Sequence, residues 1–178
     1  MAKFYDSINP KVQEFINNQK IFFVATAAEE GRVNLSPKGM DTLRVLNENR
    51  VMWLNLTGSG NETAAHLLQV NRITIMLCSF EEKPLILRLY GKAKMYQSDD
   101  KEWSEHIHLF PELAGSRQIF DIEIESVQTS CGFAVPFMEF KGERTQLVSS
   151  SEKKGEEKIK EYWKEKNSMS IDGFPTGI

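Results

Sequence analysis

Glycine, hydroxyl and amide residues gather where a predicted strand passes into a predicted helix. The run Thr57–Thr63 reads Thr-Gly-Ser-Gly-Asn-Glu-Thr, after the apolar stretch Val51–Leu56 and before the helix-forming stretch Ala64–Val70. A phosphate group needs several converging N–H or O–H donors, and a helix N-terminus supplies unpaired N–H groups and the positive end of its dipole. Two interpretations stay open: a phosphate site, or an ordinary connection in which Asn61 caps the helix.

A lysine closes a second polar run, Asn34–Gly39, which reads Asn-Leu-Ser-Pro-Lys-Gly. Lys38 either places a positive charge over an anionic or electron-rich ring, or it is an ordinary surface lysine. The chain has no Walker-type phosphate loop, and this excludes the nucleotide-hydrolase class that depends on one.

The sulfur and imidazole side chains predict little chemistry. Cys78 and Cys131 form no closely spaced pair, so we expect two free thiols in a reducing cytoplasm. No histidine has a sequence context that marks it as a base for Cys131, which we therefore expect to be a buried structural thiol. His106 and His108 are two positions apart and would point to different sides of a helix. We expect no metal site and assign no catalytic residue.

Composition limits the class of protein. About 40% of the 178 residues are hydrophobic and 26% are charged, values of a soluble globular protein. The net charge is −3 with scattered Lys and Arg, which argues against a nucleic-acid binder. The apolar runs are too short to span a bilayer, and the N-terminus lacks the apolar core of a signal peptide. We expect one domain over residues 1–178, without a membrane segment.

The predicted elements are mostly strands in hairpin-like succession, without the strand–helix alternation of a doubly wound sheet. The fold class is therefore mainly β, a six- to seven-stranded antiparallel barrel with peripheral helices. Pro37 predicts a strand end or edge, and Gly91 a bulge or close backbone approach. Strands are predicted at Ile21–Ala28, Arg32–Lys38, Thr42–Leu46, Val51–Leu56, Arg72–Phe80, Leu85–Met95 and Arg117–Thr129, and helices at Ser7–Lys20, Glu62–Val70, Asp99–Leu109 and about 152–166.

Several segments, in this order and spacing, resemble the pyridoxamine 5′-phosphate oxidase-like FMN-binding split barrels, which have Greek-key topology. The resemblance covers most of residues 1–175. It is to a smaller branch of this family and not to the oxidase proper. The segments are Ile21–Thr26, Val33–Gly39, Trp53–Thr63, Arg88–Ala93, Gln128–Phe137 and Ser170–Pro175.

The resemblance implies a homodimer with FMN at the subunit interface. By position, Asn34, Ser36 and Lys38 would flank the isoalloxazine ring, with Lys38 near its polar edge. Asn55, Leu56 and Thr57 would lie along the ring and the ribityl chain. Ser59, Asn61 and Thr63 would meet the phosphate, and Arg88 would come from the partner subunit. The chain departs from the oxidases at Asn61-Glu62-Thr63, where they carry an Arg-Lys pair, so neutral donors would hold the phosphate with help from Lys38, Arg88 or the partner.

Three functions follow from these observations. The first is an FMN-dependent oxidoreductase acting on an unidentified small molecule. The second is a split-barrel binding or sensor protein without tight FMN binding or catalysis, which takes another ligand such as haem or a deazaflavin. The third is a purely structural dimer.

Overall fold

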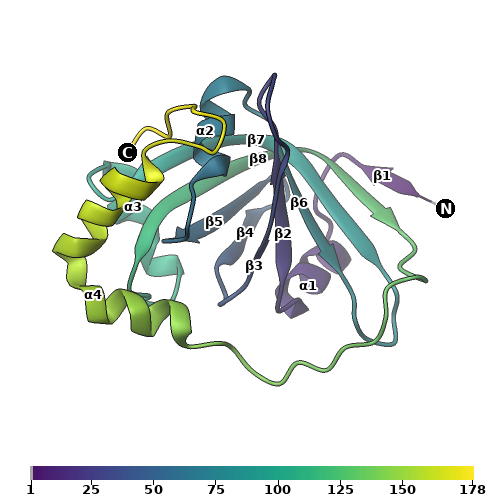
Figure 1. The fold of residues 1–178 in the computed structure, drawn as a ribbon. Coiled ribbons are helices and arrows are strands. Elements are labelled where there is room, and N and C mark those ends of the chain that lie inside the picture. The colour runs from purple at the N-terminus through teal and green to yellow at the C-terminus, as the bar shows by residue number, and fades with distance from the viewer. Residues whose placement is uncertain (1) are drawn as a thin grey trace.

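Eight strands and four helices make up the computed structural model, which describes residues 2–178 (Figure 1). The strands are β1 (Lys3–Tyr5), β2 (Phe22–Thr26), β3 (Asn34–Lys38), β4 (Leu43–Asn47), β5 (Arg50–Leu56), β6 (Ile73–Cys78), β7 (Ile86–Gln97) and β8 (Ser116–Ser130). The helices are α1 (Pro10–Asn18), α2 (Glu62–Gln69), α3 (Lys101–His106) and α4 (Gln146–Tyr162), with a 3₁₀ turn at Ile107–Leu109 and a π-helical turn at Trp163–Asn167.

All strand pairs are antiparallel, which confirms the predicted mainly-β fold class. The sheet order is β3-β2-β6-β7-β8-β5-β4, and β1 pairs with β8 outside this path. The strands β6, β7 and β8 follow one another as neighbours while the earlier β5 returns beside β8, which is a Greek-key arrangement. The seven strands of the path are those predicted, whereas no sequence pattern predicted the short β1.

Two sequence signals act as predicted. Pro37 lies in β3, which among residues 2–178 pairs only with β2 and forms one edge of the sheet. Gly91 marks a register shift between β7 and β8. A Cβ atom there would lie 2.0 Å from the carbonyl oxygen of Glu123, so only glycine allows the two backbones to approach this closely.

An aromatic stack fills the core between the two ends of the curled sheet. The rings of Trp53 and Phe120, both buried, stack at 4.8 Å between centroids, and Phe22 meets Trp53 edge-on at 6.3 Å. The apolar face of α1, Val12 and Ile16, packs into the same cluster. Because Phe22 belongs to β2 and Trp53 to β5, this contact joins strands from opposite ends of the path.

The C-terminal helix differs from the prediction of about 152–166. The helix α4 begins earlier, at Gln146, and Gly155 interrupts it with φ 74° and ψ 163°. The helix predicted to begin at Asp99 also begins later, because Asp100 is the N-cap residue of α3. Both segments are highly charged, so the sequence pattern did not mark where either helix begins. The positive φ of Gly155 interrupts α4, because a residue in this conformation cannot continue a right-handed helix.

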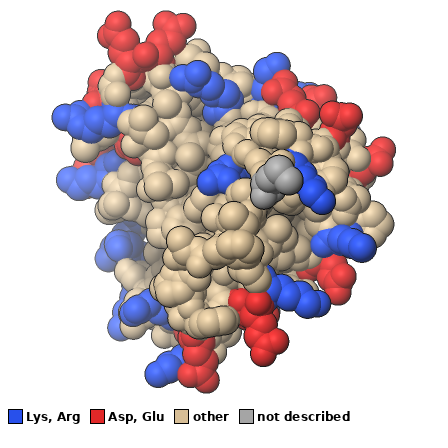
Figure 2. Space-filling view, turned by 90° about the vertical axis from the view of Figure 1, so that its right-hand side faces the viewer, with Lys and Arg blue, Asp and Glu red and all other residues tan. Residues whose placement is uncertain are grey.

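Charges of both signs are interspersed on the face that Figure 2 shows, around a largely uncharged centre. This face therefore carries no continuous basic patch of the kind that binds nucleic acid. Within residues 2–178, no helix has both the length and the apolar character needed to cross a bilayer.

Candidate cofactor and anion site

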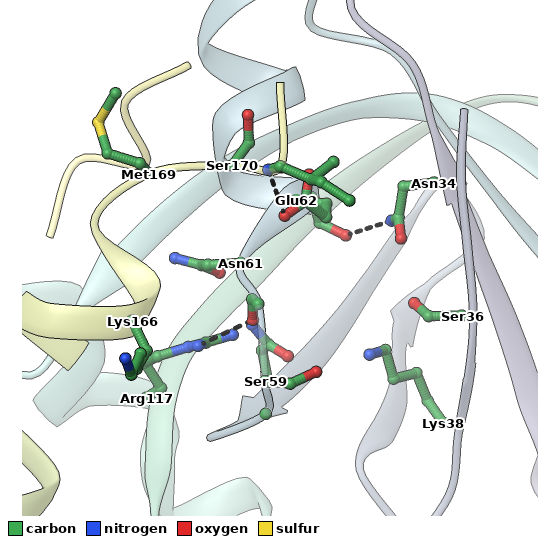
Figure 3. Close-up of a pocket in the computed structure, with 15 residues that line it drawn as sticks. Asn34, Ser36, Lys38, Ser59, Asn61, Glu62, Arg117, Lys166, Met169 and Ser170 are labelled. Carbon is green, nitrogen blue, oxygen red and sulfur yellow. Dashed lines mark hydrogen bonds between the residues drawn. The ribbon is translucent and has the colours of Figure 1, made fainter. Parts of the chain in front are cut away.

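A cavity of about 540 Å³ lies between the edge strand β3, the loop that leads into α2, and the C-terminal segment. This volume is typical of small-molecule sites. In Figure 3, Asn34, Ser36 and Lys38 lie along one wall, Arg117 and Lys166 lie on the opposite side, and Ser59 and Asn61 lie between them. The lining residues are Asn34, Ser36, Lys38, Asn55, Gly58, Ser59, Gly60, Asn61, Glu62, Thr63, Arg117, Lys166, Met169, Ser170 and Ile171.

Arg117 is a buried cation at this cavity. Its side chain extends from β8, the residue is only 3% exposed, and burial lowers its pKa to about 10. The guanidinium donates to Asn167 Oδ1 at 2.6 Å and to the Gly60 carbonyl at 3.2 Å, both neutral acceptors, and its Nε has no partner. None of the ion pairs found in residues 2–178 includes Arg117. A buried cation without a counter-ion favours an anionic ligand.

Asn61 adds an unsatisfied amide beside this cation. It lies at the N-cap position of α2, but its side chain makes no capping hydrogen bond. The residue is 2% exposed, and both Oδ1 and Nδ2 lack partners. Buried amides are normally hydrogen-bonded, so this side chain has donor and acceptor capacity that a ligand in the cavity can satisfy. The free N–H groups of the first turn of α2 add donors at the same place.

Glu62 is the acidic residue of the lining, and its carboxylate is already engaged. Both of its oxygens accept a hydrogen bond from the backbone N–H of Ile171 at 3.2 Å. The carboxylate therefore ties α2 to the C-terminal segment.

Lys38 gives the cavity a second positive side chain. Desolvation by burial is the larger cause that lowers the pKa of Lys38 to about 8, and repulsion from Arg117 is the smaller one. The ammonium lies 5.2 Å from the centroid of the Trp53 ring, a cation–π contact. Lys38 is therefore protonated at neutral pH but held in an environment that disfavours its charge, and an anion in the cavity would stabilise that charge.

A hydrogen-bond network behind the wall fixes Asn34. Its amide donates to Thr63 Oγ1 at 3.1 Å and to Thr26 Oγ1 at 3.3 Å, and Thr26 in turn contacts His66 Nδ1 at 3.1 Å. All of these partners of Asn34 are buried. The network joins β2, β3 and α2, and it holds the end of β3 against the helix N-terminus.

The C-terminal segment closes the cavity. Asn167 is fully buried and links Arg117 to the Gly58 carbonyl, to which its amide donates at 3.2 Å. Beyond it, Asp172 accepts hydrogen bonds from the backbone and the guanidinium of Arg32. These hydrogen bonds lower the pKa of Asp172. They also hold the segment 167–172 against the turn before β3.

Most of the residues that the sequence indicated meet at this cavity: Asn34, Ser36, Lys38, Asn55, Ser59, Asn61 and Thr63. Thr57 does not line it, because its hydroxyl donates to the Gly115 carbonyl and accepts from Trp163 Nε1. Leu56 packs against the smaller apolar cluster around Met52 and Leu54. Arg88 lies on β7, where it donates to Ser130 Oγ, so its predicted role through a partner subunit stays a prediction.

The expectation for Cys131 is wrong. Its side chain is exposed, whereas Cys78 is buried and burial raises the pKa of the Cys78 thiol. Cys131 follows the last residue of β8, where the chain leaves the sheet. Among residues 2–178, no three His, Cys, Asp or Glu side chains group closely enough to hold a metal ion.

Sequence reasoning missed the cavity residues Arg117, Lys166, Met169, Ser170 and Ile171. Arg117 opens a long alternating strand and looks like an ordinary solvent-facing residue at a strand end. Period-2 alternation gave no signal of its burial, because the residues on the same strand face are Ile119, Asp121, Glu123 and Glu125, most of which are charged. The C-terminal residues carry no signal either, because only the folded chain brings them to the loop after β5.

Solved structures share the fold. HupZ of Group A Streptococcus superposes with a TM-score of 0.53 at 19% identity, covering 67% of this chain and 91% of that chain. A putative pyridoxamine 5′-phosphate oxidase of Lactobacillus delbrueckii gives a TM-score of 0.55 at 14% identity, covering 69% and 94%. The predicted split-barrel architecture is thus confirmed.

Sequence comparison reaches further than the fold. The sequence model described as pyridoxamine 5′-phosphate oxidase matches residues 8–131. The pyridoxamine 5′-phosphate oxidase family protein ustO of Aspergillus flavus is 32% identical over 98% of this chain and 78% of its own length. The chain therefore belongs to the pyridoxamine 5′-phosphate oxidase family, although not to the oxidase proper.

Proposed function

We propose that the cavity binds FMN and that the protein is a flavin-dependent oxidoreductase acting on a small molecule. The observation that carries the proposal is the pairing of a buried, uncompensated cation with an unsatisfied amide, Arg117 and Asn61, at the N-terminus of α2. A phosphate monoester supplies the negative charge and the acceptor oxygens that these groups lack. The residues present therefore fit the phosphate end of FMN.

The other wall suits the ring end of the same cofactor. Asn34, Ser36 and Lys38 project from one face of β3 into the cavity. Their amide, hydroxyl and ammonium groups would meet the polar edge of an isoalloxazine ring, and Met169 and Ile171 offer apolar contact. FMN, when bound, supplies hydride and electron transfer, while the chain binds, orients and shields. Lys38, with its pKa near 8, is the group in the cavity able to hold or release a proton near neutral pH.

We propose further that the protein acts as a homodimer with the cavity at or near the subunit interface, as its family membership supports. The two free thiols fit a reducing cytoplasm as its location.

A non-catalytic binding or sensor role is the second candidate. The observation that favours it is the state of Glu62: the cavity's carboxylate is engaged by the Ile171 N–H and is not free to act as a base. Such a protein would take another ligand in this cavity, without tight FMN binding or catalysis.

The test is a titration of the purified full-length chain with FMN and, separately, with riboflavin, followed by quenching of flavin fluorescence. We expect binding of FMN with one site per chain, and binding of riboflavin that is weaker by about 150-fold or more, the loss expected for several charge-assisted hydrogen bonds to phosphate. A protein that leaves the fluorescence of both flavins unchanged would overturn the proposal. Weak FMN binding without oxidation of any reductant would favour the second candidate.

A further inference from the structure

The side chain that holds Arg117 in place is neutral. The guanidinium donates to Asn167 Oδ1 at 2.6 Å, and both residues are buried. The amide of asparagine and the carboxylate of aspartate have nearly the same shape. An aspartate at position 167 would therefore form a buried ion pair with Arg117, whereas the asparagine accepts the hydrogen bond and leaves the positive charge uncompensated.

Three hydrogen bonds fix the position of Asn167. Besides accepting from Arg117, it donates through Nδ2 to the Gly58 carbonyl at 3.2 Å, and its backbone carbonyl accepts from Thr176 Oγ1 at 2.6 Å. Because a donor must face Gly58 and an acceptor must face Arg117, one orientation of the amide satisfies both. Asn167 also ends the π-helical turn Trp163–Asn167, a distortion that is common at functional sites.

The charges around the cavity suit a dianion. Among residues 2–178, its charged lining side chains are three cations and one carboxylate, an excess of two positive charges: Lys38, Arg117, Lys166 and Glu62. A phosphate monoester carries about two negative charges at neutral pH. Of the cations, Arg117 is buried and lies near the unsatisfied amide of Asn61 (Figure 3), whereas Lys166 is more than half exposed. One added carboxylate beside Arg117 would therefore cancel the cation that matters most for the ligand.

We propose that Asn167 determines the charge specificity of the cavity: its neutral amide orients the Arg117 guanidinium and leaves the cation free to bind a phosphate monoester. The inference rests on the proposed function, because it names the residue that keeps Arg117 available for the phosphate of FMN. Asn167 acts through Arg117 and is therefore a positioning residue. It lies beyond α4, so the C-terminal part of the chain sets the charge of the ligand that the barrel accepts.

Two substitutions separate the charge of this side chain from its shape. Asn167→Asp keeps the size of the side chain and the acceptor for Arg117 but adds a negative charge. Asn167→Ala removes the acceptor and adds no charge, and both variants lose the donor to Gly58. If Asn167 only supported the structure, the alanine variant would be the more damaged of the two. The inference predicts the opposite order for FMN binding.

The test is a fluorescence titration of the wild type and both variants with FMN and with riboflavin. We expect Asn167→Asp to weaken FMN binding by about 30-fold or more, because the phosphate loses a charge-assisted partner and meets a like charge. Asn167→Ala should weaken FMN binding by less than about 10-fold, because the cation stays uncompensated. Riboflavin affinity should stay within about threefold of the wild-type value in both variants, because riboflavin has no phosphate to lose contacts.

The matched control is Asn71→Asp. Asn71 is exposed, lies outside the lining of the cavity, and accepts from the Ala93 N–H at 2.8 Å through an oxygen that aspartate retains. This variant adds the same charge to the chain, and its FMN affinity should equal that of the wild type because exposed distant charges are screened.

Two outcomes of the titrations overturn the inference. One is an Asn167→Asp protein that prefers FMN to riboflavin as strongly as the wild type does. The other is an order in which Asn167→Ala loses more FMN affinity than Asn167→Asp, or loses affinity for both flavins equally. A wild-type protein that binds neither flavin overturns the proposed function instead.

In that case, or if Asn167→Asp fails to fold, inorganic phosphate is the probe. The Nε–H group of Arg117 is buried without a partner, so its NMR signal in wild-type protein with isotope-labelled arginine should shift when phosphate is added. The signal should not shift with riboflavin. A signal that phosphate leaves unchanged shows that Asn167 keeps no cation available, and it overturns the inference.

Discussion

The replacement Arg117→Met separates ligand binding from folding stability. Arg117 is buried, its guanidinium has no acidic partner, and its Nε has none at all. Losing charge-assisted contacts to phosphate costs about 1.5–3 kcal/mol each, so we expect the FMN affinity to fall by about 10–150-fold. Riboflavin has no phosphate, and its affinity should stay within about threefold of the wild-type value because no charge-assisted contact is lost.

Stability should change much less than affinity, because two terms oppose one another. Burial lowers the pKa of Arg117 from 12.5 to about 10, which corresponds to a penalty of about 3 kcal/mol for the buried charge. Removing the guanidinium relieves that penalty but leaves Asn167 Oδ1 buried and unpaired, at a cost of about 1–3 kcal/mol. The unfolding free energy should therefore stay within about 2 kcal/mol of the wild-type value.

The assays are fluorescence titrations with both flavins and chemical denaturation of the ligand-free protein. The matched control is Lys166→Met, another cation of the same cavity, which is paired with Glu165 and more than half exposed; its effect on FMN affinity should be below about threefold, as for exposed pairs. An Arg117→Met protein that is stable and still prefers FMN to riboflavin as strongly as the wild type does would refute the assignment of the phosphate to this end of the cavity.

Three further predictions concern neighbouring residues. The pKa of Lys38 is lowered from 10.5 to about 8, so the unfolded chain binds this proton more tightly than the folded chain, and the unfolding free energy of the ligand-free protein should rise between about pH 8 and pH 10.5. FMN affinity should fall as the pH rises above about 8, because the Lys38 cation is then lost. Both pH dependences are measured against the Lys38→Met variant, which should lack them. The Asn61→Ala substitution should weaken FMN binding by about 10-fold or more without loss of stability. The Thr57→Ala substitution breaks two intramolecular hydrogen bonds, so it should lower the unfolding free energy by about 1–3 kcal/mol and leave FMN binding unchanged. The reverse pattern would show that Thr57, and not Asn61, contacts the phosphate. The Gly91→Ala substitution places a Cβ 2.0 Å from a backbone carbonyl oxygen, so it should lower the unfolding free energy by about 3 kcal/mol in a denaturant titration. The control is Gly58→Ala, because a Cβ there would lie 3.9 Å from its nearest neighbour. Equal unfolding free energies of the two variants would contradict the close approach of the backbones at Gly91.

Local patterns were sufficient for most of the secondary structure. The β-branched and aromatic runs predicted β2 and β5–β8, and the polar–apolar alternation of Asn34–Lys38 predicted a strand with two different faces. Pro37 and Gly91 act through backbone geometry, which depends only on the residue itself. The prediction failed at the C-terminal helix, where Gly155 divides a charged segment that otherwise has the composition of one helix.

The sequence by itself determined the antiparallel barrel, the polar face of β3 and the glycine loop before α2, because each depends on the order of residues close together in the chain. Only the tertiary structure decided what this loop faces. Arg117 and Asn167 donate to the carbonyls of Gly60 and Gly58 from positions more than 50 residues away in the sequence, each at 3.2 Å. The loop that carries no basic residue of its own therefore receives its cation from β8, since a buried charge is placed by the packing of distant strands and not by its neighbours along the chain.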